Sequence, residues 1–388
     1  MKGKKLLAGL LAAATLFPAN LWSVRAEGLT SDAKAAVLLE VETGQILYDE
    51  NMHTQLEPAS MTKMMGMYLI LEAIENGVMR WDEKVRVSDH AASLGGSQIY
   101  LAPGEEMTVE DLFKSVAIAS ANDSITALGE RVAGSEERFV EMMNEKAKTL
   151  GMANTVFKNP TGLPDEGHVS TAYDMAQLGR ALLLDFPDVI RFTSLYEDWL
   201  RTDTESPLWL VNTNKLLKAN LGVDGIKTGF TQRAGYNLTS TALRDGMRVI
   251  TVIMGASKSD IRSRESAALI SHAFDTYELI RKVDPDVIVG TQFNMLARNR
   301  EFDIVTMEAI SVLKSRLQAE EATSHEIELF DGLELPIVPG DEVGRLIYYY
   351  NGEEYRVIGL TVSEPVEKNS FLGLFTFIVS QLLFGEHH

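Results

Sequence analysis

The sequence predicts an α+β protein in three parts: a mixed domain of helices and strands, a small all-β domain and a short apolar helix at the C-terminus. Two observations carry this prediction. Helical patterns fill the first half of the chain and give way to strand patterns from Val223. After Asp284-Pro285 only short alternating runs remain, over about 80 residues. The expected boundaries are 1–26 for a leader, 27–282 for the mixed domain, 283–366 for the β domain and 367–388 for the helix.

Composition excludes several classes of protein. The 388 residues are 45% hydrophobic, enough to bury a sizeable core. With 36 Lys and Arg against 55 Asp and Glu, the net charge of −19 argues against nucleic acid as a partner. The absence of cysteine excludes disulfides, thiolate metal sites and a cysteine nucleophile. With seven histidines and no H-E-x-x-H motif, we expect no metal and no other cofactor.

Residues 1–26 have the parts of a secretory signal peptide. A cluster of lysines precedes the apolar run Leu6–Phe17, and Val24 and Ala26 provide a small-residue cleavage site. The alternative, a buried N-terminal helix, fits poorly because of these lysines and the break at Pro18. The sequence therefore predicts an exported protein.

The elements of the mixed domain follow in chain order. An early hairpin is expected from strands at Ala35–Leu39 and Gln45–Tyr48, and a run from Ser60 to Asn76 that is apolar on nearly every face predicts a buried helix. Further helical patterns lie at Val109–Ile118, Ser124–Val132, Glu136–Leu150, Thr171–Leu184 and Arg264–Ile280. Strands are expected at Asp224–Phe230, Tyr236–Leu243 and Arg248–Met254, the last two joined by an Asp245-Gly246 turn. Because strands occur at both ends, we expect one sheet assembled from distant segments.

The last two parts have their own patterns. Strands are expected at Glu326–Phe330, Arg345–Tyr350 and Glu354–Val362, with Asn351-Gly352 as the turn between the last two. The run Phe371–Phe384 forms a helix of about 14 residues, too short to span a bilayer and suited to lying in its interface. The apolar stripe of this helix comprises Phe371, Phe375, Ile378, Val379 and Leu382, and the opposite side carries Asn369, Gly373, Thr376 and Ser380. Docking on the protein is the alternative to membrane attachment.

The first candidate chemical motif is Ser60-Met61-Thr62-Lys63. On a helix its hydroxyl and amine lie one turn apart on the same face. A serine hydroxyl needs a base to become a nucleophile, and a desolvated lysine can have a pKa low enough to act as that base. This spacing alone is common by chance.

Two more motifs follow. Ser120-Ala121-Asn122 lies between two helical patterns, where a hydroxyl and an amide can face a shared site. In Lys227-Thr228-Gly229 a strand offers a cation and a hydroxyl to an anionic group, and glycine allows a close backbone approach. Taken singly, the first reads as an ordinary turn and the second as a solvated strand lysine.

Together and in this order, the three motifs are the signature of penicillin-binding proteins and class A β-lactamases. The chain resembles the low-molecular-weight penicillin-binding proteins that act as serine-type D-alanyl-D-alanine carboxypeptidases. The stretches that carry the resemblance are Pro58–Lys63, Ala119–Asp123, Asn159–Leu163 followed by His168 and Thr171–Asp174, Asp224–Gly229 and Ala234–Leu238. The resemblance implies a penicillin-binding-protein/β-lactamase-like catalytic domain, and a peripheral protein on the outer face of the cytoplasmic membrane.

The same resemblance implies a role for each site residue. Ser60 would be acylated by peptidoglycan stem peptides ending in D-Ala-D-Ala, and by β-lactam antibiotics, with Lys63 as base. Ser120 and Asn122 would complete the hydrogen-bond network. Lys227, Thr228 and Gly229 would face the substrate carboxylate. The oxyanion hole would be the backbone N–H groups of Ser60 and Phe230, where many relatives have histidine at the second position. Arg262 would approach the carboxylate, or would be an ordinary arginine on a helix surface.

Two rival functions remain beside the carboxypeptidase activity that the resemblance implies. A β-lactamase shares the acylation chemistry, but between Asn122 and Lys227 there is no Glu-x-x-Leu-Asn, the usual carrier of the water-activating Glu. A non-catalytic cell-wall binding module would keep the site without turnover. Release of D-alanine from a pentapeptide distinguishes the enzyme from the binding module.

Overall fold

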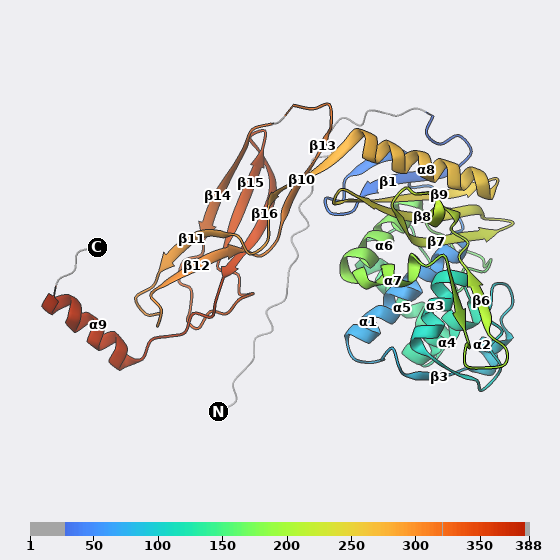
Figure 1. Ribbon diagram of the computed structural model, residues 1–388, viewed down its shortest axis with the longest axis horizontal. Helices are drawn as coiled ribbons and strands as arrows, with labels where there is room; N and C mark the ends of the chain where they lie inside the picture. The colour runs from blue at the N-terminus through green and yellow to red at the C-terminus, as the bar shows by residue number, and fades with distance from the viewer. Residues whose placement is uncertain (1–27, 320, 385–388) are drawn as a thin grey trace.

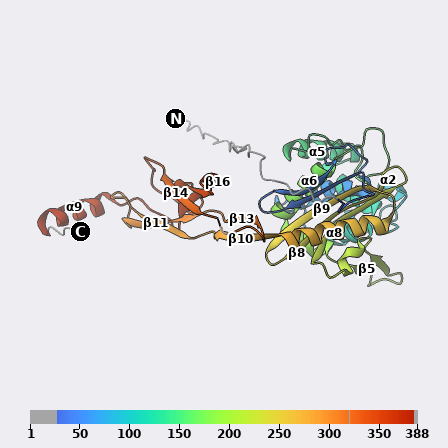
Figure 2. The same cartoon turned by 90° about the horizontal axis from the view of Figure 1, so that it is seen from above.

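The computed structural model describes residues 28–319 and 321–384, so the expected leader 1–26 lies outside the described residues. The molecule is elongated. An α+β domain lies at one end, a β domain in the middle, and helix α9 (Phe371–Phe384) at the far end (Figures 1 and 2).

A five-stranded antiparallel sheet is the frame of the N-terminal domain. Its strand order is β2-β1-β9-β8-β7. The strands are β1 (Ala35–Glu40), β2 (Ile46–Glu50), β7 (Val223–Thr231), β8 (Gly235–Arg244) and β9 (Met247–Ala256). Strand β1 pairs with β9 along its whole length, Ala35 opposite Met254 and Glu40 opposite Val249. The expected assembly of one sheet from distant segments is confirmed.

Helices cover both faces of this sheet (Figure 1). Helix α8 (Ser259–Thr276) packs on one face, and α6 (Ala172–Asp185) packs on the other. Beyond α6 lie the remaining helices: α1 (Lys63–Glu75), α2 (Asp89–Ser93), α3 (Val109–Ala119), α4 (Asn122–Ala133), α5 (Glu136–Thr149) and α7 (Ile190–Thr193). Short elements join them: η1 (Ala59–Thr62), η2 (Pro187–Val189), η3 (Lys215–Lys218), and the two-stranded sheets β3 (Lys84–Arg86) with β4 (Glu106–Thr108) and β5 (Glu197–Leu200) with β6 (Leu208–Val211).

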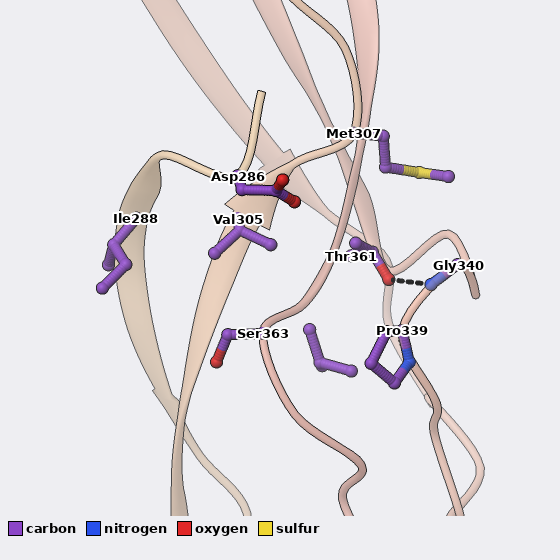
Figure 3. A pocket seen from close by; sticks show the side chains of 9 residues that line it. Asp286, Ile288, Val305, Met307, Pro339, Gly340, Thr361 and Ser363 are labelled. Atoms are coloured by element: carbon purple, nitrogen blue, oxygen red, sulfur yellow. Dashed lines mark hydrogen bonds between the residues drawn. The ribbon is translucent and has the colours of Figure 1, made fainter. Parts of the chain in front are cut away.

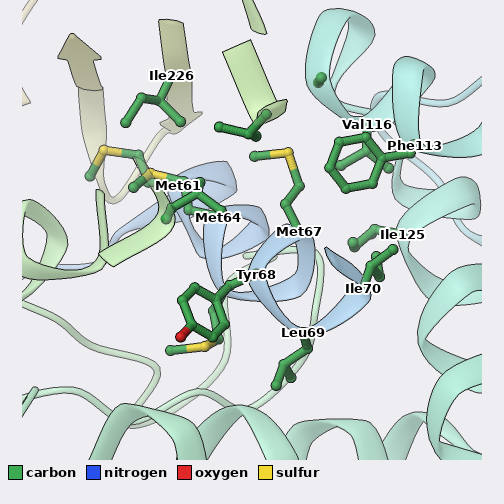
Figure 4. Close-up of a cluster of buried hydrophobic side chains, with 14 of the residues drawn as sticks. Met61, Met64, Met67, Tyr68, Leu69, Ile70, Phe113, Val116, Ile125 and Ile226 are labelled. Atoms are coloured by element: carbon green, nitrogen blue, oxygen red, sulfur yellow. The ribbon is translucent and has the colours of Figure 1, made fainter. Parts of the chain in front are cut away.

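Helix α1 is the centre of the larger hydrophobic core. It is buried on nearly every side, as its uniformly apolar sequence predicts. Figure 4 shows Met64 and Met67 pointing away from its axis into the surrounding elements, with Phe113 of α3 and Ile125 of α4 nearby. Because the helix is enclosed in this way, the position of its N-terminal residue is fixed by the packing of the whole domain.

Glycines allow three segments to meet at η1. Gly162 has φ +79°, and a Cβ atom there would lie 1.9 Å from the carbonyl oxygen of Ala59. A Cβ atom on Gly229 of β7 would lie 2.7 Å from the carbonyl oxygen of Pro58. The loop 159–163 and strand β7 therefore contact η1 at backbone distance.

One expected helix differs from the observed element. The sequence pattern suggested a helix over Arg264–Ile280, whereas α8 ends at Thr276 and Tyr277–Val283 forms strand β10. Strand β10 pairs with β13 (Ile310–Ser315) in a two-stranded sheet. Pairing with a strand that follows much later overrides the local helical pattern, which a single sequence window does not reveal.

The β domain contains a second five-stranded sheet, in the order β11-β12-β16-β15-β14. Its strands are β11 (Ile288–Phe293), β12 (Glu301–Thr306), β14 (Thr323–Leu329), β15 (Gly344–Tyr350) and β16 (Glu353–Val362). The expected Asn351-Gly352 turn joins β15 to β16. A cavity of about 450 Å³ opens beside Asp286, Val305 and Thr361 in this domain (Figure 3).

Helix α9 carries exposed apolar side chains. Among those exposed are four of the five in the predicted stripe: Phe371, Phe375, Ile378 and Leu382. Within the described ranges, no helix combines the length and apolar character needed to cross a membrane.

We predict that Gly162→Ala destabilises the N-terminal domain. Alanine at positive φ costs about 1–2 kcal/mol, and at this position its methyl group also collides with the backbone of η1. The matched control is Gly151→Ala, which has φ +72° but no atom within 4 Å of the added Cβ. Thermal unfolding should show a clearly larger loss for Gly162→Ala, by about 1–3 kcal/mol, the usual cost of overpacking. Equal losses would contradict the close packing of the loop against η1.

Candidate active site

Ser60 and Lys63 lie at the junction of η1 and α1. In a 3₁₀ turn, residues three apart are almost eclipsed, so both side chains project to the same side. The Lys63 Nζ atom donates to Ser60 Oγ at 3.2 Å and to the carbonyl oxygen of Thr161 at 2.6 Å. The contact that the motif predicts is therefore present, and the loop 159–163 supplies a second acceptor.

Lys63 is an unusual lysine because it is 0% exposed. Burial lowers its pKa well below the ordinary value, and the nearby charge of Lys227 lowers it further, while Asp123 opposes the shift. Within the described residues no carboxylate forms an ion pair with it. The environment thus favours the neutral amine, which is the form that can accept the Ser60 proton.

Ser120 and Asn122 stand at the facing ends of two helices. Ser120 ends α3 with φ +63°, and its buried Oγ has no hydrogen-bond partner among the described residues. Asn122 begins α4, and its Nδ2 atom donates to the carbonyl oxygen of Gly95 at 2.7 Å. A left-handed backbone at a non-glycine residue with a free buried hydroxyl is typical of a functional position.

Asp123 supports the backbone around Ser120 and Asn122. The sequence motifs did not identify it as a site residue. Its buried carboxylate accepts the backbone N–H groups of Ile99, Leu101 and Ser124 at 3.1 Å, 3.1 Å and 2.9 Å. It therefore ties the segment 99–101 to the start of α4. Its position directly after the Ser-Ala-Asn motif is the only sequence signal, and that signal does not distinguish a surface aspartate from a buried one.

Lys227 and Thr228 lie on β7, one of the two edge strands of the sheet. Lys227 is buried, so the alternative of a solvated strand lysine is wrong. Burial lowers its pKa to about 7, with Arg262 as the second cause. Thr228 forms a hydrogen bond with the hydroxyl of Thr213. Among the residues that the structure describes, the only acceptor for the Lys227 Nζ atom is the Thr228 carbonyl oxygen, at 3.3 Å.

Arg262 lies in the first turn of α8 and is 3% exposed, so the alternative of a helix-surface arginine is wrong. Its guanidinium donates to the Asn237 carbonyl oxygen and to Ser259 Oγ, both at 3.3 Å, while Nε has no partner among the described residues. Burial lowers its pKa to about 10. Lys63, Lys227 and Arg262 are thus three buried basic groups without a carboxylate ion pair in the described structure.

Phe230 follows Gly229 and is half exposed. Its ring stacks on Tyr236 of β8, with ring centres 4.3 Å apart. A Cβ atom on Gly229 would lie 3.1 Å from the amide nitrogen of Ser60, which shows how closely this part of β7 approaches the Ser60 backbone.

His168 also supports the turn that carries Ser60. Its Nε2 atom is 2.8 Å from the Thr62 hydroxyl, and its Nδ1 atom accepts the Lys158 backbone N–H at 3.3 Å. Burial lowers its pKa to about 4, which keeps the ring neutral at physiological pH. Within the described parts of the chain, no cluster of His, Cys, Asp and Glu side chains could hold a metal ion.

Comparison with known proteins shows the family of the chain. A family model described as D-alanyl-D-alanine carboxypeptidase, of the peptidase S11 type, matches residues 23–258. The chain is 43% identical to the D-alanyl-D-alanine carboxypeptidase DacF of Bacillus subtilis, over 90% of this chain and 89% of that protein.

Solved structures show the same fold. Penicillin-binding protein 5 of Haemophilus influenzae superimposes with a TM-score of 0.70 at 28% identity, covering 87% of this chain and 98% of that one. Penicillin-binding protein D2 of Listeria monocytogenes, in an ampicillin-bound form, gives a TM-score of 0.56 at 35% identity, covering 62% and 97%. The expected penicillin-binding-protein fold is confirmed. The chain belongs to the D-alanyl-D-alanine carboxypeptidase family, peptidase S11, and is a serine-type D-Ala-D-Ala carboxypeptidase.

Proposed function

We propose that Ser60 is the nucleophile that removes the terminal D-alanine and that Lys63 is its general base. The observation that carries this is the buried Lys63 amine 3.2 Å from Ser60 Oγ. The neutral amine takes the hydroxyl proton while Oγ attacks the carbonyl of the penultimate D-alanine. The bond to the terminal D-alanine breaks, its nitrogen receives a proton, and D-alanine leaves. Water then hydrolyses the ester and regenerates Ser60.

Ser120 and Asn122 assist this transfer. The unpartnered Ser120 hydroxyl can pass the proton from Lys63 to the departing nitrogen, because a hydroxyl donates and accepts at once. Asn122, fixed by its bond to Gly95, offers its amide to the peptide chain of the substrate. Ser120 thus acts after the nucleophile has attacked, whereas Asn122 acts on the bound substrate.

Lys227, Thr228 and Arg262 form the pocket for the terminal carboxylate. Among the described residues, the buried positive charges of Lys227 and Arg262 have no carboxylate partner, and a bound substrate supplies one. The incoming anion also favours the charged form of Lys227, whose pKa lies at about 7 in the free enzyme. Gly229 keeps the strand close to η1, so that the backbone N–H groups of Ser60 and Phe230 can form the oxyanion hole.

β-Lactams would react with the same serine, since their strained amide resembles the scissile bond. The ampicillin-bound relative from Listeria supports this reaction. The β-lactamase alternative needs a carboxylate that activates water. Asp123, the buried acid that acts on Lys63 electrostatically, is already engaged by three backbone N–H groups. The acyl-enzyme formed with penicillin should therefore persist.

We further propose how the chain is divided and where it works. Residues 1–26 direct export, 27–282 form the catalytic domain, 283–366 form a spacer, and 367–388 attach the protein peripherally to the outer face of the cytoplasmic membrane. The exposed apolar side chains of α9 support attachment in the membrane interface. In Figure 1 the β domain lies between α9 and the catalytic domain, which would hold the site away from the lipid.

We predict one covalent penicillin per protein, bound at Ser60 and lost more slowly than a D-Ala-D-Ala peptide is turned over. Intact-mass measurement should show the adduct in the wild type and none in Ser60→Ala. Lys63→Ala should acylate about 10²–10⁴-fold more slowly, the range for loss of a general base. An adduct on Ser60→Ala would contradict the assignment of Ser60 as the nucleophile. Penicillin hydrolysis faster than D-alanine release would favour the β-lactamase alternative.

We predict that removing residues 370–388 greatly weakens membrane binding and leaves activity on a soluble peptide unchanged. Burying each large apolar side chain of α9 in the interface is worth about 1.5–3 kcal/mol, and none of these side chains belongs to the catalytic domain. Sedimentation with lipid vesicles measures the first effect, and D-alanine release measures the second. Membrane binding at full strength without these residues would show that α9 is not the anchor.

A further inference from the structure

The loop between β11 and β12 exposes two large apolar side chains at the end of the β domain that bears α9. Met295 is 48% exposed and Leu296 is 49% exposed, beside Phe293 at the end of β11. In both overall views this end of the molecule is remote from the catalytic domain (Figures 1 and 2). Exposed apolar residues that gather in one place commonly mark a contact surface.

This loop is a defined structure. The Asn294 side chain accepts the Leu296 backbone N–H at 2.9 Å, and the Asn294 carbonyl oxygen accepts the Ala297 N–H at 3.0 Å. Ala297 is buried in the core of the β domain. The chain is therefore anchored at Ala297 while the two preceding side chains face outward, so folding does not hide their apolar surface.

The loop is also joined to the segment that leads into α9. The Asn369 N–H donates to the Leu296 carbonyl oxygen, and the Arg298 N–H donates to the Glu367 carbonyl oxygen, both at 2.8 Å. The Arg300 guanidinium lies 3.4 Å from the ring centre of Phe377 on α9. The apolar tip and the helix are thus neighbouring parts of one surface.

The charges of this surface suit lipid headgroups. Although the chain carries a net charge of −19, the loop and the adjoining segment bring together Arg298, Arg300 and Lys368. Arg298 pairs with Glu367, whereas Arg300 forms no ion pair within the described part of the chain. Cations beside apolar side chains are the usual composition of a membrane-interface contact.

We infer that the tip formed by Phe293, Met295 and Leu296 is a second membrane-contacting element, which enters the bilayer interface together with α9. This inference rests on the proposed attachment through α9. A single short helix leaves the rest of the protein free to rotate about the lipid surface, whereas two contacts joined by backbone hydrogen bonds fix the tilt of the β domain. The tip therefore sets the direction in which the catalytic domain points away from the membrane.

The absence of cysteine allows a direct test, because one introduced cysteine carries a single polarity-sensitive fluorophore. Three full-length proteins are labelled: Met295→Cys at the tip, Leu372→Cys on α9, and Leu317→Cys as the control. Leu317 is 97% exposed and follows Arg316, whose backbone N–H donates to the carbonyl oxygen of Thr276 at the end of α8, on the catalytic-domain side. Each is mixed with phosphatidylglycerol–phosphatidylethanolamine vesicles, with and without a lipid-borne quencher.

We expect vesicles to brighten the label at 295 and the label at 372, with quenching by the lipid quencher, and to leave the label at 317 unchanged. A response at 372 without one at 295 would overturn the inference and leave the attachment through α9 intact. No response at either position would overturn both. A response at 295 that appears without vesicles as the protein concentration rises would assign the tip to a second copy of the chain.

A second measurement uses unlabelled protein. Met295→Ser with Leu296→Ser should weaken binding to the same vesicles about tenfold, because two partly buried apolar side chains are lost from the interface. Leu317→Ser should not change it. Unchanged affinity in the double variant would contradict the inference.

Discussion

The candidate active site depends on keeping the buried Lys63 amine uncharged, away from water. Taking an ammonium group out of water without a partner costs several kcal/mol, and within the described structure the only acceptors of Lys63 Nζ are a hydroxyl and a carbonyl oxygen. The protein lowers this cost by favouring the neutral form, and the neutral form is the one that the proposed role of Lys63 as general base requires. Lys227 adds to the effect, since two cations would repel one another in this dry region.

Much of the catalytic domain serves to hold this arrangement. Helix α1 is enclosed by core side chains, so its first residue, Lys63, cannot turn toward solvent. Strand β7 and the loop 159–163 both pack closely against the backbone of residues 58–60. This packing holds Ser60 within reach of the Lys63 amine. The antiparallel sheet brings β7 beside β8 and β9, and α8 follows β9, so Arg262 lies near Lys227 although the two are far apart in the sequence.

The sequence predicted those features that depend on local pattern. The structure contains the buried helix that was expected after Ser60. It also contains both expected hairpin turns, at Asp245-Gly246 and Asn351-Gly352. The joining of distant strands into one sheet was also predicted, but other features that depend on distant contacts were not. Tyr277–Val283 forms a strand only because Ile310–Ser315 pairs with it. The burial of Lys227 and Arg262 follows from tertiary packing, which spacing along the chain does not encode.

The titration of Lys63 tests this account most directly. In protein labelled with ¹³C-lysine, the Lys63 ε-carbon signal is identified by its absence from the spectrum of Lys63→Arg. Since burial favours the neutral amine, the pH at which this signal titrates should lie well below 10.5, the ordinary value for lysine. Replacing Lys227 with alanine should raise that pH, because the nearby positive charge is removed. A Lys63 signal that titrates at the ordinary pH of an exposed lysine, and that is unaffected by Lys227→Ala, would contradict the account.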